Sequence, residues 1–197
     1  MAGTKVANPA PLGLLGFGLT TVLLNIHNAG LMEFNVMILA MGLCYGGTAQ
    51  IIAGIMEFRN KNVFGATAFT SYGLFWLSLC TIWINPFGSA AANGQAMGWH
   101  LLMWGIFTLF MFIGSLKHNR VTQFVFFSLT LLFFLLACGD FIGSKTTITI
   151  AGIVGIVCGL SAAYSAFAQI LNNEFGKTML PLCELKDKFI KSGQVRF

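Results

Sequence analysis

Residues 121–139 read VTQFVFFSLTLLFFLLACG, and this run contains no Asp, Glu, Lys or Arg. Its length is close to the roughly 20 residues that an α-helix needs to cross the hydrocarbon core of a bilayer. Other stretches share this length and this lack of charge, namely residues 12–28, 36–56, 64–84, 97–116 and 148–172. The sequence therefore predicts an all-α, polytopic membrane protein with six transmembrane helices.

The composition of the whole chain agrees with a lipid environment. Of its 197 residues, 56% are hydrophobic and only 9% are charged, and the mean hydropathy is +0.80. A soluble domain carries roughly a quarter of charged residues, so this chain has too little polar surface to cover a globule in water. Its five Cys residues form no CxxC pair and are expected to be reduced packing residues. We expect no metal and no other cofactor.

Lys and Arg residues are distributed unevenly between the two sides of the predicted bundle. One side carries Lys5, Arg59, Lys61, Lys117, Arg120, Lys177, Lys186, Lys188, Lys191 and Arg196, whereas the other carries only Lys145. Because basic residues near membrane spans favour the cytoplasmic side, both termini are predicted to be cytoplasmic, in a multi-pass protein of the inner (plasma) membrane. The formal charge of +5 reflects this asymmetry, so no nucleic-acid partner is expected.

Short connections between the apolar stretches predict a single six-helix transport domain over residues 1–181. No basic leader with a small-residue cleavage site precedes the first stretch, so the first helix is expected to stay in the protein. Residues 182–197 are predicted to form a basic cytoplasmic tail. Two interpretations of this tail stay open: an amphipathic segment on the anionic inner leaflet, or a plain end of the chain.

The predicted spans contain neutral polar groups but no carboxylate, Lys or Arg in mid-membrane. The 6 acidic residues fall in loops, tails or span ends, so a carboxylate proton relay or a cation cage has no obvious residues. Hydroxyl and amide side chains recur at helical spacing in every span. The candidate substrate contacts among them are Thr20, Thr21, Gln50 and Ser71, with Phe17 and Tyr72 on the same stripes. A lone Ser or Thr often bonds only to its own helix, but six stripes favour a narrow, neutral pathway.

The beginning of the first span has an unusual composition, VANPAPLGLLGFGLTT at residues 6–21. Asn8 is expected to cap the helix, the prolines preset its backbone angles, and Gly13 leaves main-chain groups uncovered. The first-turn N–H groups and the positive end of the helix dipole would then form a weak anion site without an Arg. This predicted site comprises Asn8, Pro9, Ala10, Pro11, Leu12 and Gly13. The alternative is an ordinary helix start, which explains the Asn and one Pro but not the combination of two Pro residues and a Gly.

Three long blocks resemble the acetate uptake transporter family: NPAPLGLLGFGLTT at 8–21, FGATAFTSYGLFW at 64–76 and FTLFMFIGSLKHNRVTQFVFFSLTLLF at 107–133. The resemblance covers nearly the whole chain. It implies a urea-channel-like protomer of six helices around a central pore, assembled into a homohexamer. It also implies carriage of acetate, succinate and related small carboxylates, often with protons. By the same resemblance, Phe17, Tyr72 and Leu131 would form a hydrophobic pore constriction.

The leading hypothesis is therefore an acetate and succinate permease, either passive or proton-linked. If protons accompany the solute, either the acid itself carries them or His27 or His100 does; His100 is expected to be a structural donor. A second hypothesis is a channel for small uncharged solutes such as urea, ammonia or water. An intramembrane enzyme or a receptor is a third, but the spans contain no paired carboxylates, Ser/His dyad or metal cluster, so no enzyme is expected.

Overall fold

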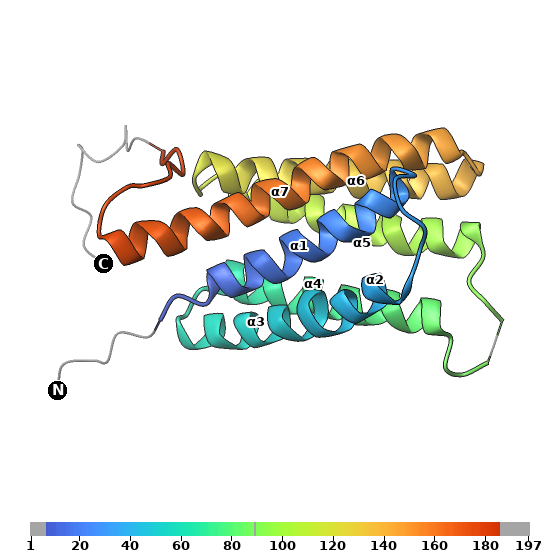
Figure 1. Cartoon of the computed structure of the whole chain (residues 1–197), viewed down its shortest axis with the longest axis horizontal. Helices are drawn as coiled ribbons and strands as arrows, with labels where there is room; N and C mark the ends of the chain where they lie inside the picture. Colours follow the sequence, from blue (N-terminus) through green and yellow to red (C-terminus); the bar gives the residue numbers. More distant parts are fainter. Residues whose placement is uncertain (1–6, 89, 186–197) are drawn as a thin grey trace, which may run out of the picture.

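The computed structural model describes residues 7–88 and 90–185, and this part of the chain folds into a bundle of long helices (Figure 1). Within it, six helical spans are long and apolar enough to cross a membrane. Five spans are single helices: α1 (Ala10–Asn28), α4 (Val63–Ile84), α5 (Gly94–Ser115), α6 (Arg120–Ile142) and α7 (Lys145–Phe175). The remaining span joins α2 (Val36–Met41), the π-helix η1 (Gly42–Ala49) and α3 (Gln50–Arg59). The predicted all-α class and the six spans are confirmed.

Side chains in the connections fix where the helices begin. Polar residues at the N-caps accept a hydrogen bond from a first-turn N–H group; they are Asn35, Asn62, Asn93, Asn119 and Ser144. At the other ends, Asn85, Gly143 and Gly176 adopt left-handed backbone angles that stop α4, α6 and α7. These caps satisfy backbone groups that lipid cannot hydrogen-bond, which favours Asn, Ser and Gly at these helix ends.

Helix α1 occupies the middle of the bundle (Figure 1). It packs along α7 on one side and against η1 and α3 on the other, while α5 packs on α6 and α3 on α4. The start of α1 and the end of α7 lie at the same end of the bundle, which we call the terminal end. Most of the predicted cytoplasmic tail, residues 186–197, and Lys5 fall outside the described residues. Which side of a membrane the terminal end faces therefore stays a prediction.

Small residues let the central helix approach its neighbours closely. A Cβ atom added to Gly18 would lie 2.7 Å from the Gly159 carbonyl oxygen, and one added to Gly159 would lie 2.6 Å from the Gly18 oxygen. On the second span, a Cβ on Gly46 would lie 2.9 Å from both Thr20 and Trp76. Without a hydrophobic force between helices in lipid, such close backbone contact supplies the packing energy. Gly42 with Gly46 and Gly155 with Gly159 form GxxxG pairs, and these contacts show that both pairs serve helix packing.

We predict that Gly159→Ala destabilises the bundle by about 1–3 kcal/mol, because the new methyl group meets backbone atoms of α1 that cannot turn aside. Gly114→Ala in α5 is the matched control, since its Cβ would meet only the edge of the Phe64 ring, at 3.1 Å. Thermal unfolding in detergent, followed by size-exclusion chromatography, should show a lower midpoint for the first variant alone. Equal midpoints would contradict the close-contact account.

Candidate functional site

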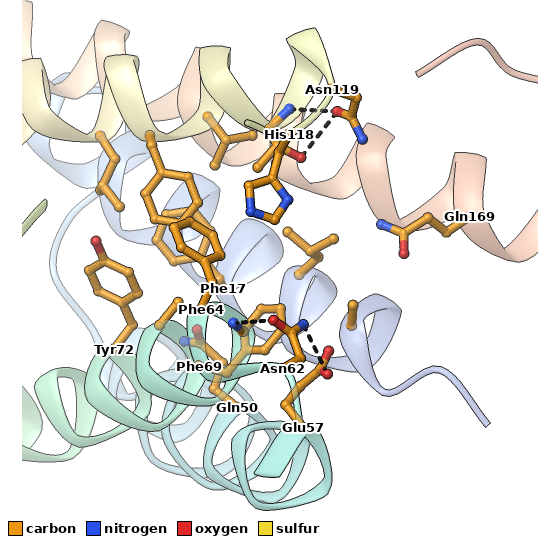
Figure 2. Close-up of a pocket in the computed structure, with 18 of the residues that line it drawn as sticks. Phe17, Gln50, Glu57, Asn62, Phe64, Phe69, Tyr72, His118, Asn119 and Gln169 are labelled. Carbon is orange, nitrogen blue, oxygen red and sulfur yellow. Dashed lines mark hydrogen bonds between the residues drawn. The ribbon is translucent and has the colours of Figure 1, made fainter. Parts of the chain in front are cut away.

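A cavity of about 290 Å³ opens at the terminal end of the bundle (Figure 2). It lies between α1, α3 and α4 on one side and α6 and α7 on the other. Its lining residues are Ala10, Leu14, Phe17, Gln50, Glu57, Asn62, Phe64, Gly65, Ala68, Phe69, Tyr72, His118, Asn119, Thr122, Val125, Phe126, Leu129, Gln169, Leu182 and Glu184. Among these described residues there is no Lys or Arg, so the wall supplies no permanent cation.

The mouth of this cavity is polar. Asn62 Nδ2 donates to Glu57 Oε2 at 3.1 Å, and Asn62 Oδ1 accepts from the first turn of α4. Glu57 is only 3% exposed although it carries a carboxyl group. On the other wall, the His118 ring packs on Phe64 with centroids 4.5 Å apart, and Asn119 caps α6 (Figure 2). A solute therefore meets amide, imidazole and carboxyl groups first.

Three buried side chains line the part of the cavity away from this polar mouth, and we call this group the neck. It consists of Phe17 from α1, Tyr72 from α4 and Leu129 from α6, all less than 9% exposed. The Phe17 and Tyr72 ring centroids are 6.0 Å apart. The lining ends here, and Tyr72 packs onward against Trp104 with centroids 6.2 Å apart. The cavity thus ends at these three side chains, and a central pore through the bundle stays a prediction.

Leu131 was the predicted third member of the constriction, and the structure corrects this assignment. Its side chain is 41% exposed on the outer face of α6 and does not line the cavity. Leu129 precedes it by two positions, which turns a helical side chain by about 200°. Leu129 is 3% exposed, lines the cavity and lies on one helix face with Thr122, Val125 and Phe126. The polar Thr122 at this spacing is the sequence signal that identifies the correct face.

The hydroxyl group of Tyr72 belongs to a directed chain of hydrogen bonds. Thr108 Oγ1 lies 2.7 Å from the Trp104 carbonyl oxygen, which can only accept, so the Thr108 hydroxyl donates there. Tyr72 Oη lies 2.9 Å from Thr108 Oγ1 and must therefore donate to it. Both hydroxyl protons point away from the cavity, toward α5. Tyr72 can offer the cavity only oxygen lone pairs.

Gln50 is held by the π-helical segment that precedes it. Its Nε2 donates to the Gly46 carbonyl oxygen at 2.7 Å, and its Oε1 has no hydrogen-bond partner among the described residues. The amide cannot be flipped, because Oε1 would then face another acceptor. In the same segment, Thr48 Oγ1 donates to the Leu43 oxygen at 2.9 Å. π-Helices often mark functional sites, and this one sets the direction of a fully buried amide at the wall of the cavity.

The predicted anion site, Asn8 to Gly13, lies at the mouth but contributes little wall. Of Asn8, Pro9, Ala10, Pro11, Leu12 and Gly13, only Ala10 lines the cavity. The amide nitrogen of Ala10 donates to Asn8 Oδ1 at 3.1 Å, and those of Leu12 and Gly13 donate to the Pro9 oxygen. Asn8 does not occupy the N-cap position, which is Pro9. Asn8 Nδ2 instead donates to Gln169 Oε1 at 2.9 Å and links α1 to α7.

The other predicted contact residues lie away from the cavity. Thr20 and Thr21 are buried one turn beyond Phe17 on α1, where Thr20 Oγ1 lies 3.4 Å from the Met41 oxygen. Thr21 Oγ1 is buried without a partner in the described part of the chain. Ser71 is half-buried on α4 and does not line the cavity, although Tyr72 beside it does. Of the residues predicted as substrate contacts, the structure brings only Ala10 and Gln50 to the cavity wall.

Two features of the mouth were missed by the sequence reasoning. Glu57 follows Gln50 by seven positions, so the two share a face of α3, and this spacing could have identified it. The segment after α7 also folds back: Tyr164 Oη donates to the Pro181 oxygen at 2.9 Å, and Leu182 and Glu184 line the cavity. The start of the segment predicted as a free tail therefore contributes to the wall.

The two predicted candidate proton carriers lie outside the cavity wall. His27 Nδ1 lies 2.9 Å from the Met32 oxygen at the end opposite the mouth. The His100 ring stacks on Phe75 with centroids 5.8 Å apart, and its Nε2 has no hydrogen-bond partner within the described residues. His100 was expected to donate a structural hydrogen bond, but its Nε2 donates none to the described residues. Its ring packs against aromatic side chains.

Comparison with known proteins agrees with this architecture. The chain is 56% identical over 186 residues to the succinate-acetate/proton symporter SatP of Escherichia coli K12, covering 93% of this chain and 99% of that protein. It is 37% identical over 179 residues to the ammonia transport outward protein 2 of Saccharomyces cerevisiae, covering 86% of this chain and 64% of the yeast protein. A solved structure of the bacterial acetate channel SatP matches with a TM-score of 0.88 and 56% identity, covering 90% of this chain and 99% of that chain.

The family assignment rests on nearly the full length of the chain. A model of the GPR1/FUN34/yaaH family matches residues 1–186, which include every helix described above. The family resemblance carried by the sequence motifs is confirmed by this match and by the structural similarity. The protein belongs to the GPR1/FUN34/yaaH family of acetate uptake transporters.

Proposed function

We propose that this membrane protein is a transporter, not an enzyme, for acetate and related short carboxylates including succinate, with protons accompanying the solute. The observation that carries the proposal is a small cavity with a polar mouth and an apolar neck, lined by no Lys or Arg in the described chain. The 56% identity to a succinate-acetate/proton symporter supports the substrate class. A site without a fixed cation binds weakly, which suits a solute that must also leave.

The path that we propose runs from the mouth to the neck and then along α1. A carboxylic solute exchanges water for the amides of Asn62, Asn119 and Gln169, and loses most of its remaining hydration between Phe17, Tyr72 and Leu129. The segment from Asn8 to Gly13 acts through the positive end of the α1 dipole, because the N–H groups of Ala10, Leu12 and Gly13 already have acceptors. Thr20 and Thr21 would line the path beyond the neck when it opens.

The placement in the membrane and the assembly also belong to this proposal. The uneven distribution of Lys and Arg orients the terminal end, and with it the mouth of the cavity, toward the cytoplasm. The protein would lie in the inner membrane with both termini cytoplasmic. Outward apolar side chains such as Leu131 and Phe127 would face lipid or a neighbouring copy in a homohexamer.

A channel for small uncharged solutes is the second candidate. The uncharged neck fits such solutes equally well, and the yeast relative is named for outward ammonia transport. The two candidates differ in competition: a carboxylate transporter should be inhibited by excess acetate or succinate, whereas a channel for ammonia, urea or water should not.

Uptake of labelled acetate into proteoliposomes of the purified protein tests the proposal. We expect uptake above that of protein-free vesicles, reduced by excess unlabelled acetate and by succinate, because these solutes share one narrow path. Uptake no faster than in empty vesicles at any pH between 5 and 7.5, with normally folded protein, would refute the function.

Shortening Leu129 should widen the neck. We predict that Leu129→Ala increases uptake of bulkier monocarboxylates such as lactate several-fold relative to acetate, because the side chain lost lies in the constriction. Leu131→Ala is the matched control: it removes the same atoms from the outer face of α6 and should leave the ratio unchanged. If only Leu131→Ala changed the ratio of lactate to acetate uptake, Leu131 and not Leu129 would belong to the constriction.

The pH dependence of acetate uptake should not depend on His100. We predict that His100→Gln keeps the pH dependence of acetate uptake, because the ring packs on Phe75 outside the cavity lining. Initial uptake rates between pH 5 and 7.5, normalised to the amount of reconstituted protein, provide the measurement. A flat pH profile in the correctly folded variant would make His100 the proton carrier.

A further inference from the structure

The segment that follows α7 returns to the mouth of the cavity in two parts. Residues 179–181, which we call the clamp, are fixed to α7 by side chains of that helix. Residues 182–185, which we call the arm, continue from the clamp to the start of α6 (Figure 1). Resting on the function proposed above, we propose that the arm is a hinged lid that controls the entry of solutes at the terminal end.

The clamp is firmly held. Asn172 Nδ2 donates to the Leu180 oxygen at 2.8 Å, and Asn172 Oδ1 accepts from the Met179 and Leu180 amide nitrogens at 2.7 and 3.0 Å. Tyr164 Oη donates to the Pro181 oxygen at 2.9 Å. The Pro181 ring also fixes its own φ angle and restricts the residue before it. Two side chains of α7 therefore determine where the arm begins.

The arm is held much less firmly. Within the described residues, one hydrogen bond joins it to the bundle, from the Arg120 amide nitrogen to the Cys183 oxygen at 3.2 Å. Cys183 has a φ of 54°, in the left-handed region that residues other than Gly adopt only at a cost. Leu182 and Leu185 are half-buried, whereas Cys183 and Glu184 are exposed. The arm can leave the bundle by breaking this bond and these apolar contacts, with relief of the strain at Cys183, while the clamp stays in place.

The arm lies where a solute enters the cavity. Leu182 and Glu184 line the same cavity as His118 and Asn119 of the mouth, and the arm is bonded to Arg120, the residue after Asn119. A carboxylate solute gains no hydrogen bond from Leu182 and is repelled by an ionised Glu184. The closed arm should therefore slow entry, and an open arm should expose the mouth to water and solute. This control acts at the mouth and is separate from the neck.

Access to the cavity can be measured without transport. Ala68 lines the cavity and is 4% exposed, so a thiol introduced by Ala68→Cys reports access through the mouth. A membrane-impermeant methanethiosulfonate is added to the full-length protein in detergent. Peptide mass spectrometry then separates modification at position 68 from modification of the five native Cys residues. A closed arm predicts slow modification of this probe.

Asn172→Ala should release the clamp, because it removes the hydrogen bonds to Met179 and Leu180. The modification rate of the Ala68→Cys probe should rise about tenfold or more, the scale expected when several hydrogen bonds are lost. Asn173→Ala is the matched control: it removes the same atoms from the next position of α7, where the exposed side chain makes no hydrogen bond within the described residues. Its modification rate should equal that of the protein with both Asn residues intact.

A covalent lock tests the arm in the opposite direction. The hydrogen bond between Arg120 and Cys183 brings the two backbones close together, so Arg120→Cys should form a disulfide with the native Cys183 under mild oxidation. Locking the arm should lower acetate flux into proteoliposomes several-fold, and a reductant should restore it. Arg59→Cys is the control, because Arg59 is exposed at the end of α3 and has no described hydrogen bond to the arm.

The outcomes separate the lid from the transport function. Faster probe modification in Asn172→Ala alone, with flux that falls on locking and recovers on reduction, supports the lid. Equal modification rates in all three proteins, flux that the disulfide leaves unchanged, or a bridge that forms equally with Arg59→Cys overturns the lid even if acetate is transported. Absence of acetate flux at every pH overturns the proposed function, and the modification rates then decide on the lid alone. If Asn172→Ala does not fold, Tyr164→Phe, which removes the bond to Pro181, takes its place.

Discussion

The hydrogen bond from Gln50 Nε2 to the Gly46 oxygen fixes the direction of a buried amide at the wall of the cavity. It depends on η1, the π-helix in the middle of the second span, which positions α3 so that Gln50 and Glu57 face the cavity. Glycines make this geometry compatible with tight packing: Gly46 and Gly47 lie where a Cβ would meet Trp76 and Leu77. The π-helix, the close contact with α4 and the direction of one amide therefore form a single structural unit.

The membrane imposes the other constraint, because polar groups inside it must find partners in the protein. Thr108, Ser128 and Thr130 each donate to a carbonyl oxygen in the preceding turn of their own helix. Such internal bonds satisfy the hydroxyl donors within each helix. The cavity wall likewise contains no Lys or Arg in the described chain, so its polarity comes mainly from neutral groups.

Much of the fold could be predicted from the sequence, because length and apolarity alone identify a span in lipid. The GxxxG spacing of Gly42 with Gly46 and of Gly155 with Gly159 is also visible in the sequence, and these glycines lie at close helix contacts. The site was harder to predict. Phe17, Tyr72 and Gln50 follow from helical stripes, but Leu131 was assigned by resemblance and lies on the opposite face from Leu129. The π-helix, the buried Glu57 and the return of residues 182–184 over the mouth depend on tertiary packing, which local patterns do not encode.

The ratio of protons to acetate molecules is the most direct measurement of the central claim. Internal pH, reported by a trapped dye, and labelled acetate uptake can be followed together in proteoliposomes whose membrane potential is clamped by valinomycin and potassium. Acetate transport accompanied by protons, as proposed above, predicts internal acidification that rises in step with acetate uptake. Acetate uptake with a matching current and no internal acidification would contradict the account.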